Sequence, residues 1–219
     1  MIKMFAVYET FASIQGESTY AGLPCFFIRF AGCNLRCAYC DTVKAQEASA
    51  GKMMSENDLL KLVEENAKGI DLVELTGGEP LLQRDLPLLA EKLIAAGKTV
   101  LIETNGSVDI SALPEAVVRI VDWKGPSSGM EPEMLESNFR ILRPRDQVKF
   151  VIADDADFDA ALSVIRKFDL PSQTAHILFS PAWGSDVKHM AERIVAERLP
   201  VRVNLQFHKY IWGPTVEGV

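Results

Sequence analysis

The sequence predicts an α/β fold, a partial (β/α) barrel of parallel strands with helices on its outside. Short runs of β-branched and aromatic residues alternate with helical stretches along the chain. Most of these runs are apolar on both faces, as expected for strands covered on each side. Polar or special residues follow nearly every run, and 219 residues are few for a full eight-fold barrel. We expect a single domain over residues 1–219.

Seven runs are expected to form strands. They are residues 25–30, 71–76, 99–104, 117–123, 147–152, 176–180 and 201–207. Because strands and helices alternate, right-handed crossovers should join consecutive strands and leave them parallel in one sheet.

Four stretches between these runs are expected to form helices. Ser55 begins the first, which ends at Gly69. Residues 86–96 carry leucines and an isoleucine at helical spacing, and residues 155–168 and 186–198 fit amphipathic helices. These helices would cover the outside of the sheet.

The strand ends share a chemical character. Directly after them come Arg29 with the cysteine loop, TGGEP (76–80), ETNG (103–106), DWKGP (122–126), SPAWG (180–184) and QFHK (206–209). In a barrel of parallel strands all these ends lie on one rim, where such folds hold their active sites. We therefore expect one shared site instead of scattered loop chemistry.

The charge balance excludes some classes of partner. A formal net charge of −7 argues against a surface that grips phosphate backbones or anionic membranes, so we expect neither nucleic acid nor membrane as a partner. No apolar run is long enough to span a bilayer, and the first residues are too interrupted for a signal peptide. We expect a cytoplasmic protein with reduced thiols.

Three of the four cysteines lie together in GCNLRCAYCDT, residues 32–42. Structural zinc needs four ligands, usually in two pairs, but the chain has no second C-x-x-C and its histidines lie far from this loop. Three cysteines can instead hold a 4Fe–4S cluster and leave one iron open to a small molecule. A degenerate zinc knuckle or a loop of reduced thiols is the alternative. Cys25 stands alone on a strand and is expected in the core.

The cysteine motif CNLRCAYC resembles the signature of radical S-adenosylmethionine (SAM) enzymes, and TGGEP resembles their glycine-rich SAM-binding motif. Further blocks make the chain similar to the 7-carboxy-7-deazaguanine synthase family, and they span almost the whole chain. They are residues 9–18, 22–42, 76–83, 103–106, 122–129, 149–151, 180–184 and 206–213.

This resemblance implies a radical SAM partial barrel, usually homodimeric, that needs magnesium. It also implies conversion of 6-carboxy-5,6,7,8-tetrahydropterin to 7-carboxy-7-deazaguanine with loss of ammonia. That reaction belongs to the biosynthesis of queuosine and related 7-deazapurines. An electron donor such as flavodoxin would be a partner.

The same resemblance implies roles for individual residues, with no catalytic group beyond the cluster and SAM. Cys33, Cys37 and Cys40 would hold the 4Fe–4S cluster, and Thr42 would be a ligand of Mg²⁺. The residues expected to bind SAM are Tyr39, Gly77, Gly78, Glu79, Lys124, Ser127 and Ser180. The residues expected to bind the pterin are Ile14, Gln15, Gly16, Glu17, Arg29, Thr76, Glu103, Asn105 and His208.

Some of these residues also have plainer interpretations. Arg29 is a charge inside an apolar strand and needs a partner, which is either the substrate carboxylate or an internal salt bridge. Without the resemblance, Asp41 and Thr42 would be interpreted as a turn or helix cap. Ser18 stands where the family often has glycine, so the first loop is expected to differ.

Two other functions compete with the pterin enzyme. One is a radical SAM activating enzyme, which would place a radical on a partner protein. The other is a non-catalytic zinc-binding interaction module. The pterin-like blocks at both ends of the chain argue against the activating enzyme, and metal analysis separates the zinc module.

Overall fold

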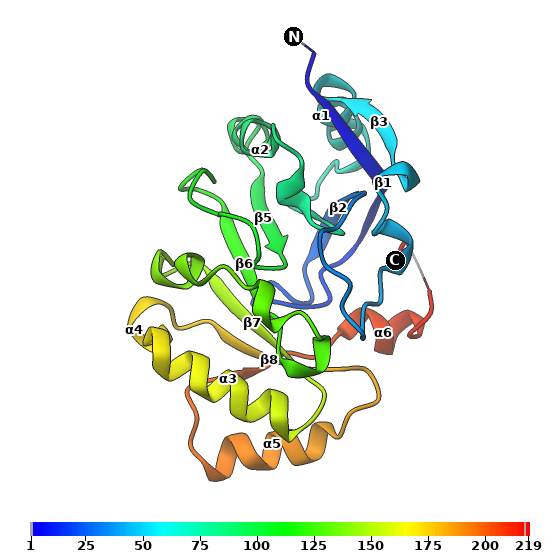
Figure 1. Ribbon diagram of the computed structural model, residues 1–219. Helices are drawn as coiled ribbons and strands as arrows, with labels where there is room; N and C mark the ends of the chain where they lie inside the picture. The colour runs from blue at the N-terminus through cyan, green and yellow to red at the C-terminus, as the bar shows by residue number, and fades with distance from the viewer. Residues whose placement is uncertain (1, 217) are drawn as a thin grey trace.

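The computed structural model describes residues 2–216 and 218–219, and within them nine strands form one open sheet (Figure 1). The strand order is β3-β1-β2-β4-β5-β6-β7-β8-β9. From β2 to β9 neighbouring strands are parallel, whereas β1 pairs antiparallel with both β2 and β3. The strands are β1 (Met4–Ile14), β2 (Pro24–Phe30), β3 (Lys52–Ser55), β4 (Leu72–Gly77), β5 (Thr99–Thr104), β6 (Val118–Trp123), β7 (Gln147–Ile152), β8 (Ile177–Pro181) and β9 (Arg202–Val203).

All seven expected strands form, and the partial barrel of parallel strands is confirmed with an antiparallel edge added to it. The last one is shorter than expected, because only Arg202–Val203 pairs with β8. The chain then turns, and the N–H of Phe207 donates to the carbonyl of Gly16 at 2.9 Å. Strands β1 and β3 were not expected, since they lie at the edge and are partly exposed instead of apolar on both faces.

The four expected helices form as α1 (Glu56–Asn66), α2 (Leu86–Ala95), α3 (Asp155–Phe168) and α5 (Val187–Ala196). Ser55 caps α1 in a capping box, in which its hydroxyl accepts from the N–H of Asp58 at 3.2 Å. Two short helices, α4 (Leu170–Gln173) and α6 (Phe207–Trp212), were not expected.

The expected alternation of strand and helix is wrong in the middle of the sheet. The connections from β5 to β6 and from β6 to β7 contain no α-helix in the part of the chain that the structure describes. Glycine and proline residues at 125–132 interrupt any longer helix there. The short 3₁₀ turns of the chain are Val43–Ala45, Ala48–Ala50, Pro80–Leu82, Pro126–Ser128, Glu131–Glu133 and Glu136–Arg140.

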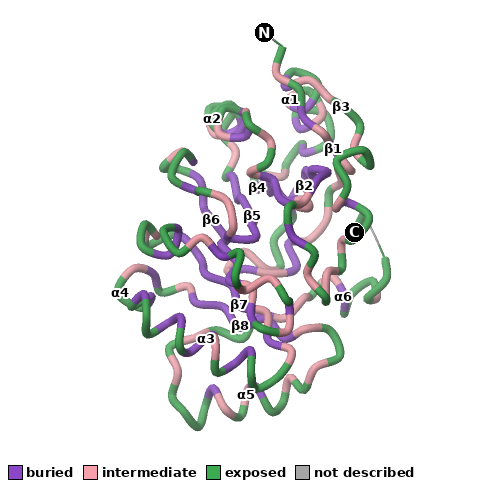
Figure 2. The backbone as a smooth tube through the Cα atoms, viewed as in Figure 1, coloured by how far each residue is buried: buried purple, intermediate pink, exposed green. Residues whose placement is uncertain are grey.

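The sheet has an outer face under the helices and an inner face around a cavity. The outer core joins strand residues such as Ile28 and Val73 to helix residues such as Leu89 and Phe158. A smaller inner cluster lies near the amino ends of the strands, and Figure 2 shows that the central strands are buried. Its buried members are Cys25, Phe27, Leu72, Leu101, Val118 and Ile120.

Near the carboxyl ends, the inner positions become polar or charged. Arg29 on β2 lies level with Thr76 on β4, and Asp122 on β6 lies level with Lys149 on β7. Because side chains alternate between the faces of a strand, these residues share the inner face. The rim predicted from the strand ends is therefore polar on its inner side.

A buried ion pair lies at the amino ends of β6 and β7. Arg119 and Asp146 are 1% and 0% exposed, and the Nε of Arg119 donates to the Asp146 carboxylate at 2.8 Å. The same carboxylate accepts from the N–H of Arg143 at 2.7 Å, so it ties a connecting loop to the sheet. No helix in the described part of the chain has the length and apolar character needed to cross a membrane.

Candidate active site

A cavity of about 760 Å³ opens at the carboxyl ends of the parallel strands. It is lined by the cysteine loop, the ends of the strands and the C-terminal segment. All the predicted site residues line it except Glu79 and Ser127. Those that do are Ile14, Gln15, Gly16, Glu17, Arg29, Cys33, Cys37, Tyr39, Cys40, Thr42, Thr76, Gly77, Gly78, Glu103, Asn105, Lys124, Ser180 and His208.

The three clustered cysteines line this cavity as partly exposed free thiols, whereas Cys25 is buried elsewhere. The N–H of Cys33 donates to the carbonyl of Gln46 at 2.9 Å, and its sulfur accepts from the N–H of Leu35 at 3.4 Å. Burial raises the pKa of the Cys33 and Cys37 thiols. Their thiolates therefore need a cationic partner, which iron provides.

The donors around the loop do not form a closed site for one metal ion. Among the described residues, no three His, Cys, Asp or Glu side chains are placed to hold a single ion. Each thiolate of a 4Fe–4S cluster binds a different iron, so its sulfurs need not converge on one point. Three thiols in one loop match the three protein ligands of an open cluster, whereas a zinc knuckle needs four donors around one ion.

Two glycines allow the end of β4 to lie against the cysteine loop. A Cβ on Gly78 would lie 2.8 Å from the Cβ of Cys33 and would overlap the carbonyl oxygen of Gly32. A Cβ on Gly77, whose φ is 154°, would overlap the backbone of Phe30. The glycine-rich motif and the cysteine loop therefore form one wall of the cavity.

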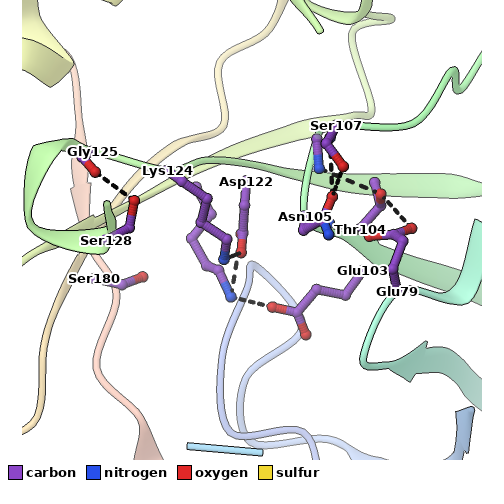
Figure 3. A network of polar contacts seen from close by, with 12 residues as sticks. Glu79, Glu103, Thr104, Asn105, Ser107, Asp122, Lys124, Gly125, Ser128 and Ser180 are labelled. Atoms are coloured by element: carbon purple, nitrogen blue, oxygen red, sulfur yellow. Dashed lines mark hydrogen bonds and ion pairs between the residues drawn. The ribbon is translucent and has the colours of Figure 1, made fainter. Parts of the chain in front are cut away.

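Glu79 lies behind this wall, fully buried. Its carboxylate accepts from the N–H of Asn105 at 2.7 Å and from the hydroxyl of Thr104 at 2.8 Å (Figure 3). Burial raises the pKa of Glu79 to about 7, against the hydrogen bonds that favour its charged form. The side chain of Asn105 in turn donates to that of Asn34 at 3.1 Å. Glu79 thus joins β4 to the end of β5 and the cysteine loop, and reaches a ligand only through these residues.

The residues predicted on the SAM side have different environments. The hydroxyl of Tyr39 is buried without a hydrogen-bond partner among the described residues, and burial raises its pKa to about 12. Lys124 forms an ion pair with Asp122 (Figure 3). Ser127 lies outside the cavity, where its N–H donates to the Asp157 carboxylate at 2.9 Å. Tyr39 therefore offers a polar group to a ligand, and Ser127 does not.

At the opposite end, the plainer interpretation of Arg29 has a structural counterpart. The Nε of Arg29 pairs with the Glu9 carboxylate at 2.8 Å, so the internal salt bridge is present, while Arg29 still lines the cavity. Thr42 directly precedes the Val43–Ala45 3₁₀ turn, but its side chain makes no capping hydrogen bond. The hydroxyl of Thr42 donates to Asp41 at 3.0 Å, and Asp41 pairs with Lys209 at 2.8 Å.

Helix α6 is tied to the first loop beside the cavity. Gln206 donates from its amide to the Glu17 carboxylate at 3.0 Å. The ring of His208 lies so close to Gly16 that a Cβ there would overlap it, and burial lowers the pKa of His208. Ser18, in the same loop, adopts a left-handed backbone with a φ of 66°. This conformation favours the glycine common in the resembled family.

Sequence reasoning predicted Glu17 and Glu103 but missed the three charged residues beside them, Glu74, Asp122 and Lys149. Lys149 forms ion pairs with Glu17, Glu103 and Asp122, and Glu74 is 2% exposed beside them. A signal was present, because Glu74, Asp122 and Lys149 each interrupt an apolar strand at an inward position. A buried charge needs partners, and neighbouring strands supply them here.

The fold and this site define a class of protein. Residues 27–167 match the radical SAM superfamily, and the chain belongs to it. Membership implies a 4Fe–4S cluster and SAM as cofactors. The crystal structure of QueE from Escherichia coli has the same fold, with a TM-score of 0.75 and 24% identity over 94% of this chain and 95% of that one.

Curated relatives narrow the class further. The 7-carboxy-7-deazaguanine synthase of Koribacter versatilis is 40% identical, over 97% of this chain and 99% of its own. That of Thermoplasma acidophilum is 41% identical, again over 97% and 99%. The chain belongs to the 7-carboxy-7-deazaguanine synthase family, so the family and fold class predicted from the sequence are confirmed.

Proposed function

We propose that this chain is a carbon–nitrogen lyase that converts 6-carboxy-5,6,7,8-tetrahydropterin to 7-carboxy-7-deazaguanine and releases ammonia. The product serves the biosynthesis of queuosine and related 7-deazapurines. The observation that carries the proposal is the meeting of two residue sets in one cavity. Three cysteines at C-x-x-x-C-x-x-C spacing suit an open cluster, and the 14–17 loop with Arg29 suits a small anionic heterocycle.

Cys33, Cys37 and Cys40 would hold the cluster and leave one iron for SAM. When bound, the cluster and SAM supply the radical that takes a hydrogen atom from the substrate. The chain's own part is to hold both molecules close together and to exclude water. The apolar side chains of Leu35 and Phe27 contribute to the walls that do this.

On the SAM side, Gly77 and Gly78 allow a ligand to approach the backbone closely. The unpaired hydroxyl of Tyr39 and the ammonium group of Lys124 offer hydrogen bonds, and Ser180 lines the same region. Glu79 and Ser127 would act from behind these residues, by fixing the strand end and the loop that carry them.

On the substrate side, Arg29 is the cation proposed for the pterin carboxylate. Its pair with Glu9 uses Nε, and the terminal nitrogens of the guanidinium suit a carboxylate. Ile14, Gln15, Gly16 and His208 would enclose the ring. Thr76, Glu103 and Asn105 would meet its polar edge, together with Glu17.

Magnesium is proposed at Thr42. Mg²⁺ prefers oxygen ligands and keeps waters or substrate oxygens, so one protein hydroxyl is enough to direct it. The residues present fit this ion, because the Thr42 hydroxyl donates its hydrogen bond to Asp41 at 3.0 Å and leaves the oxygen's lone pairs for a cation. Asp41 also pairs with Lys209 at 2.8 Å.

The proposal includes three partners or settings. A reduced electron donor such as flavodoxin would reduce the cluster. A second copy of the chain would form a homodimer, which the exposed apolar side chains of Phe207, Ile211 and Trp212 on α6 support. The cytoplasm is the proposed location, because its reducing conditions preserve free thiols.

Anaerobic reconstitution tests the function. The protein is loaded with iron and sulfide and given the carboxytetrahydropterin, SAM, Mg²⁺ and dithionite. Release of the deazaguanine and ammonia is then followed by mass spectrometry. We expect a brown protein with acid-labile sulfide that forms product only when all components are present.

Matched variants identify the cluster ligands. Replacing Cys37 by Ala should abolish iron retention and turnover, whereas replacing the buried Cys25 by Ala should leave both intact. Loaded protein that cleaves SAM but leaves the pterin unchanged would refute the pterin assignment and return the activating enzyme to consideration. Colourless protein that retains one zinc ion would support the interaction module instead.

A further inference from the structure

Lys149 binds three carboxylates that come from three different elements. Its ammonium group pairs with Glu103 on β5, with Glu17 after β1 at 3.2 Å and with Asp122 on β6 at 3.4 Å. The lysine is only 6% exposed, and it lies on the inner face of β7. Its position therefore fixes where Glu17 and Glu103, two residues of the cavity wall, hold their carboxylates.

Glu74 supports the same two residues from the other side. The amide of Gln15 donates to its carboxyl group, and the Gln15 oxygen accepts from the N–H of Glu17 at 2.8 Å. Burial raises the pKa of the Glu74 carboxyl, and the charge of Glu103, on the neighbouring strand β5, raises it further. A carboxyl group that is buried beside another negative charge favours its neutral form.

We propose that Lys149 and Glu74 are positioning residues of the substrate site, which aim the carboxylates of Glu17 and Glu103 at a ligand edge rich in hydrogen-bond donors. This inference rests on the proposed function. A pterin presents such an edge in its 2-amino group and the adjacent N3–H. An ionised carboxylate accepts from two such donors at once and repels an edge that carries carbonyl oxygens.

The charges of the residues around Lys149 agree with this positioning role. The carboxyls of Glu17, Glu74, Glu103 and Asp122 meet the ammonium groups of Lys149 and Lys124. Burial, and then the adjacent charge of Glu103, raise the pKa of Glu74 well above its usual range. Burial also raises the pKa of Glu103, but Lys149 opposes that rise. Both directions favour a neutral Glu74 beside a Glu103 whose charge Lys149 stabilises, which leaves Glu103 as an acceptor.

The test compares two stable ring systems as ligands of the reconstituted holoprotein with SAM and Mg²⁺. One is 6-carboxypterin, which has the 2-amino group, and the other is 6-carboxylumazine, which has an oxygen there. Because a hydrogen bond to a charged group is lost, we expect the native protein to bind the pterin at least about tenfold more tightly. In Lys149→Met the preference should fall to about threefold or less, with cluster absorbance and SAM affinity unchanged.

Two further comparisons separate positioning from general damage. Arg119→Met also removes a buried cation paired to a carboxylate, but at the amino ends of the strands, so it should keep the native preference. Glu74→Gln keeps an acceptor oxygen for the Gln15 amide, so it should keep the preference, whereas Glu74→Met removes that acceptor and should lose the preference. If Lys149→Met fails to fold, the comparison of Glu74→Gln with Glu74→Met tests the proposal.

Each contrary result has a definite meaning. An unchanged preference in Lys149→Met overturns the role of Lys149. Equal losses in Glu74→Gln and Glu74→Met, or an unchanged preference in both, overturn the support that Glu74 gives through Gln15. Native protein that turns over the pterin but binds both ring systems equally overturns the inference and leaves the proposed function. Native protein that neither binds carboxypterin nor forms product overturns both.

Discussion

Replacing Gly78 by alanine tests the contact between the glycine-rich motif and the cysteine loop. The new methyl group would lie 2.8 Å from the Cβ of Cys33, whereas unstrained carbons stay about 3.5 Å or more apart. It would also overlap the carbonyl of Gly32, a backbone group that cannot rotate away. The loop must therefore move away from β4, and overpacking of this kind costs about 1–3 kcal/mol.

The same movement threatens two backbone hydrogen bonds. The N–H of Glu79 donates to Gly32 at 2.8 Å and that of Gly78 donates to Phe30 at 3.1 Å, and each contributes about 1 kcal/mol. Alanine also lowers the conformational entropy of the unfolded chain, which offsets about 0.4–1 kcal/mol of this destabilisation. We expect Gly78→Ala to lose roughly 2–4 kcal/mol of unfolding free energy in denaturant titrations, and to bind less iron per chain after reconstitution.

Gly97→Ala is the matched control for this prediction. Gly97 has a left-handed φ of 83°, which Gly78 does not share, and a Cβ at Gly97 would meet no atom within 4 Å. Left-handed strain should cost this variant about 1–2 kcal/mol without any change in iron content. If Gly78→Ala matched the native protein in both stability and iron content, the claim that Gly78 packs closely against the cysteine loop would be wrong.

Three further variants probe other parts of the structure. Arg119→Met leaves the Asp146 carboxylate buried and unpaired, so about 3–5 kcal/mol of unfolding free energy should be lost in denaturant, with normal iron content in the folded fraction. Thr42→Val keeps the side-chain shape but removes the hydroxyl, so Mg²⁺ should no longer stimulate turnover; a retained response would exclude this ligand. The pKa of Glu79 is raised from 4.5 to about 7, so the folded state binds the extra proton and stability falls as pH rises through that window. The unfolding free energy of Glu79→Gln, measured relative to that of the native apoprotein, should therefore rise by roughly 2–3 kcal/mol from pH 5 to pH 8. Parallel profiles of unfolding free energy against pH would contradict this.

The parallel part of the fold was predictable because its strands are buried on both faces. Runs such as 25–30 and 147–152 are mostly apolar on both faces, with single charges at Arg29 and Lys149, and hardly fit another element. β1 escaped prediction because its residues are mostly half-buried, and its place is set by pairing with β2 and β3. The helix-free crossovers after β5 and β6 depend on how loops pack, which periodicity does not report.

The site was predictable where residue type alone indicates chemistry. Clustered cysteines and adjacent glycines carry such a signal, and both line the cavity. Glu79 shares the motif of Gly78, yet it points behind the wall, because strand geometry and not motif membership decides the direction of a side chain. Lys149 carried a local signal as a charge in an apolar strand, but its partners lie on other elements and become visible only when the sheet is formed.

Residues of the outer core and charged residues of the inner face have different roles, the first in stability and the second in recognition. Near the amino ends the inner face holds an apolar cluster that includes Phe27 and Leu101, which keeps water from entering below the charged residues. Where water is excluded, the ion pairs of Lys149 are directional, but burying these charges costs free energy. Proteins in which apolar residues replace such buried ion pairs are often as stable. The stable frame comes instead from the larger outer core, to which Val73 and Phe158 belong. Substitutions there should change stability alone, whereas the charges around Lys149 are retained for what they aim at the cavity.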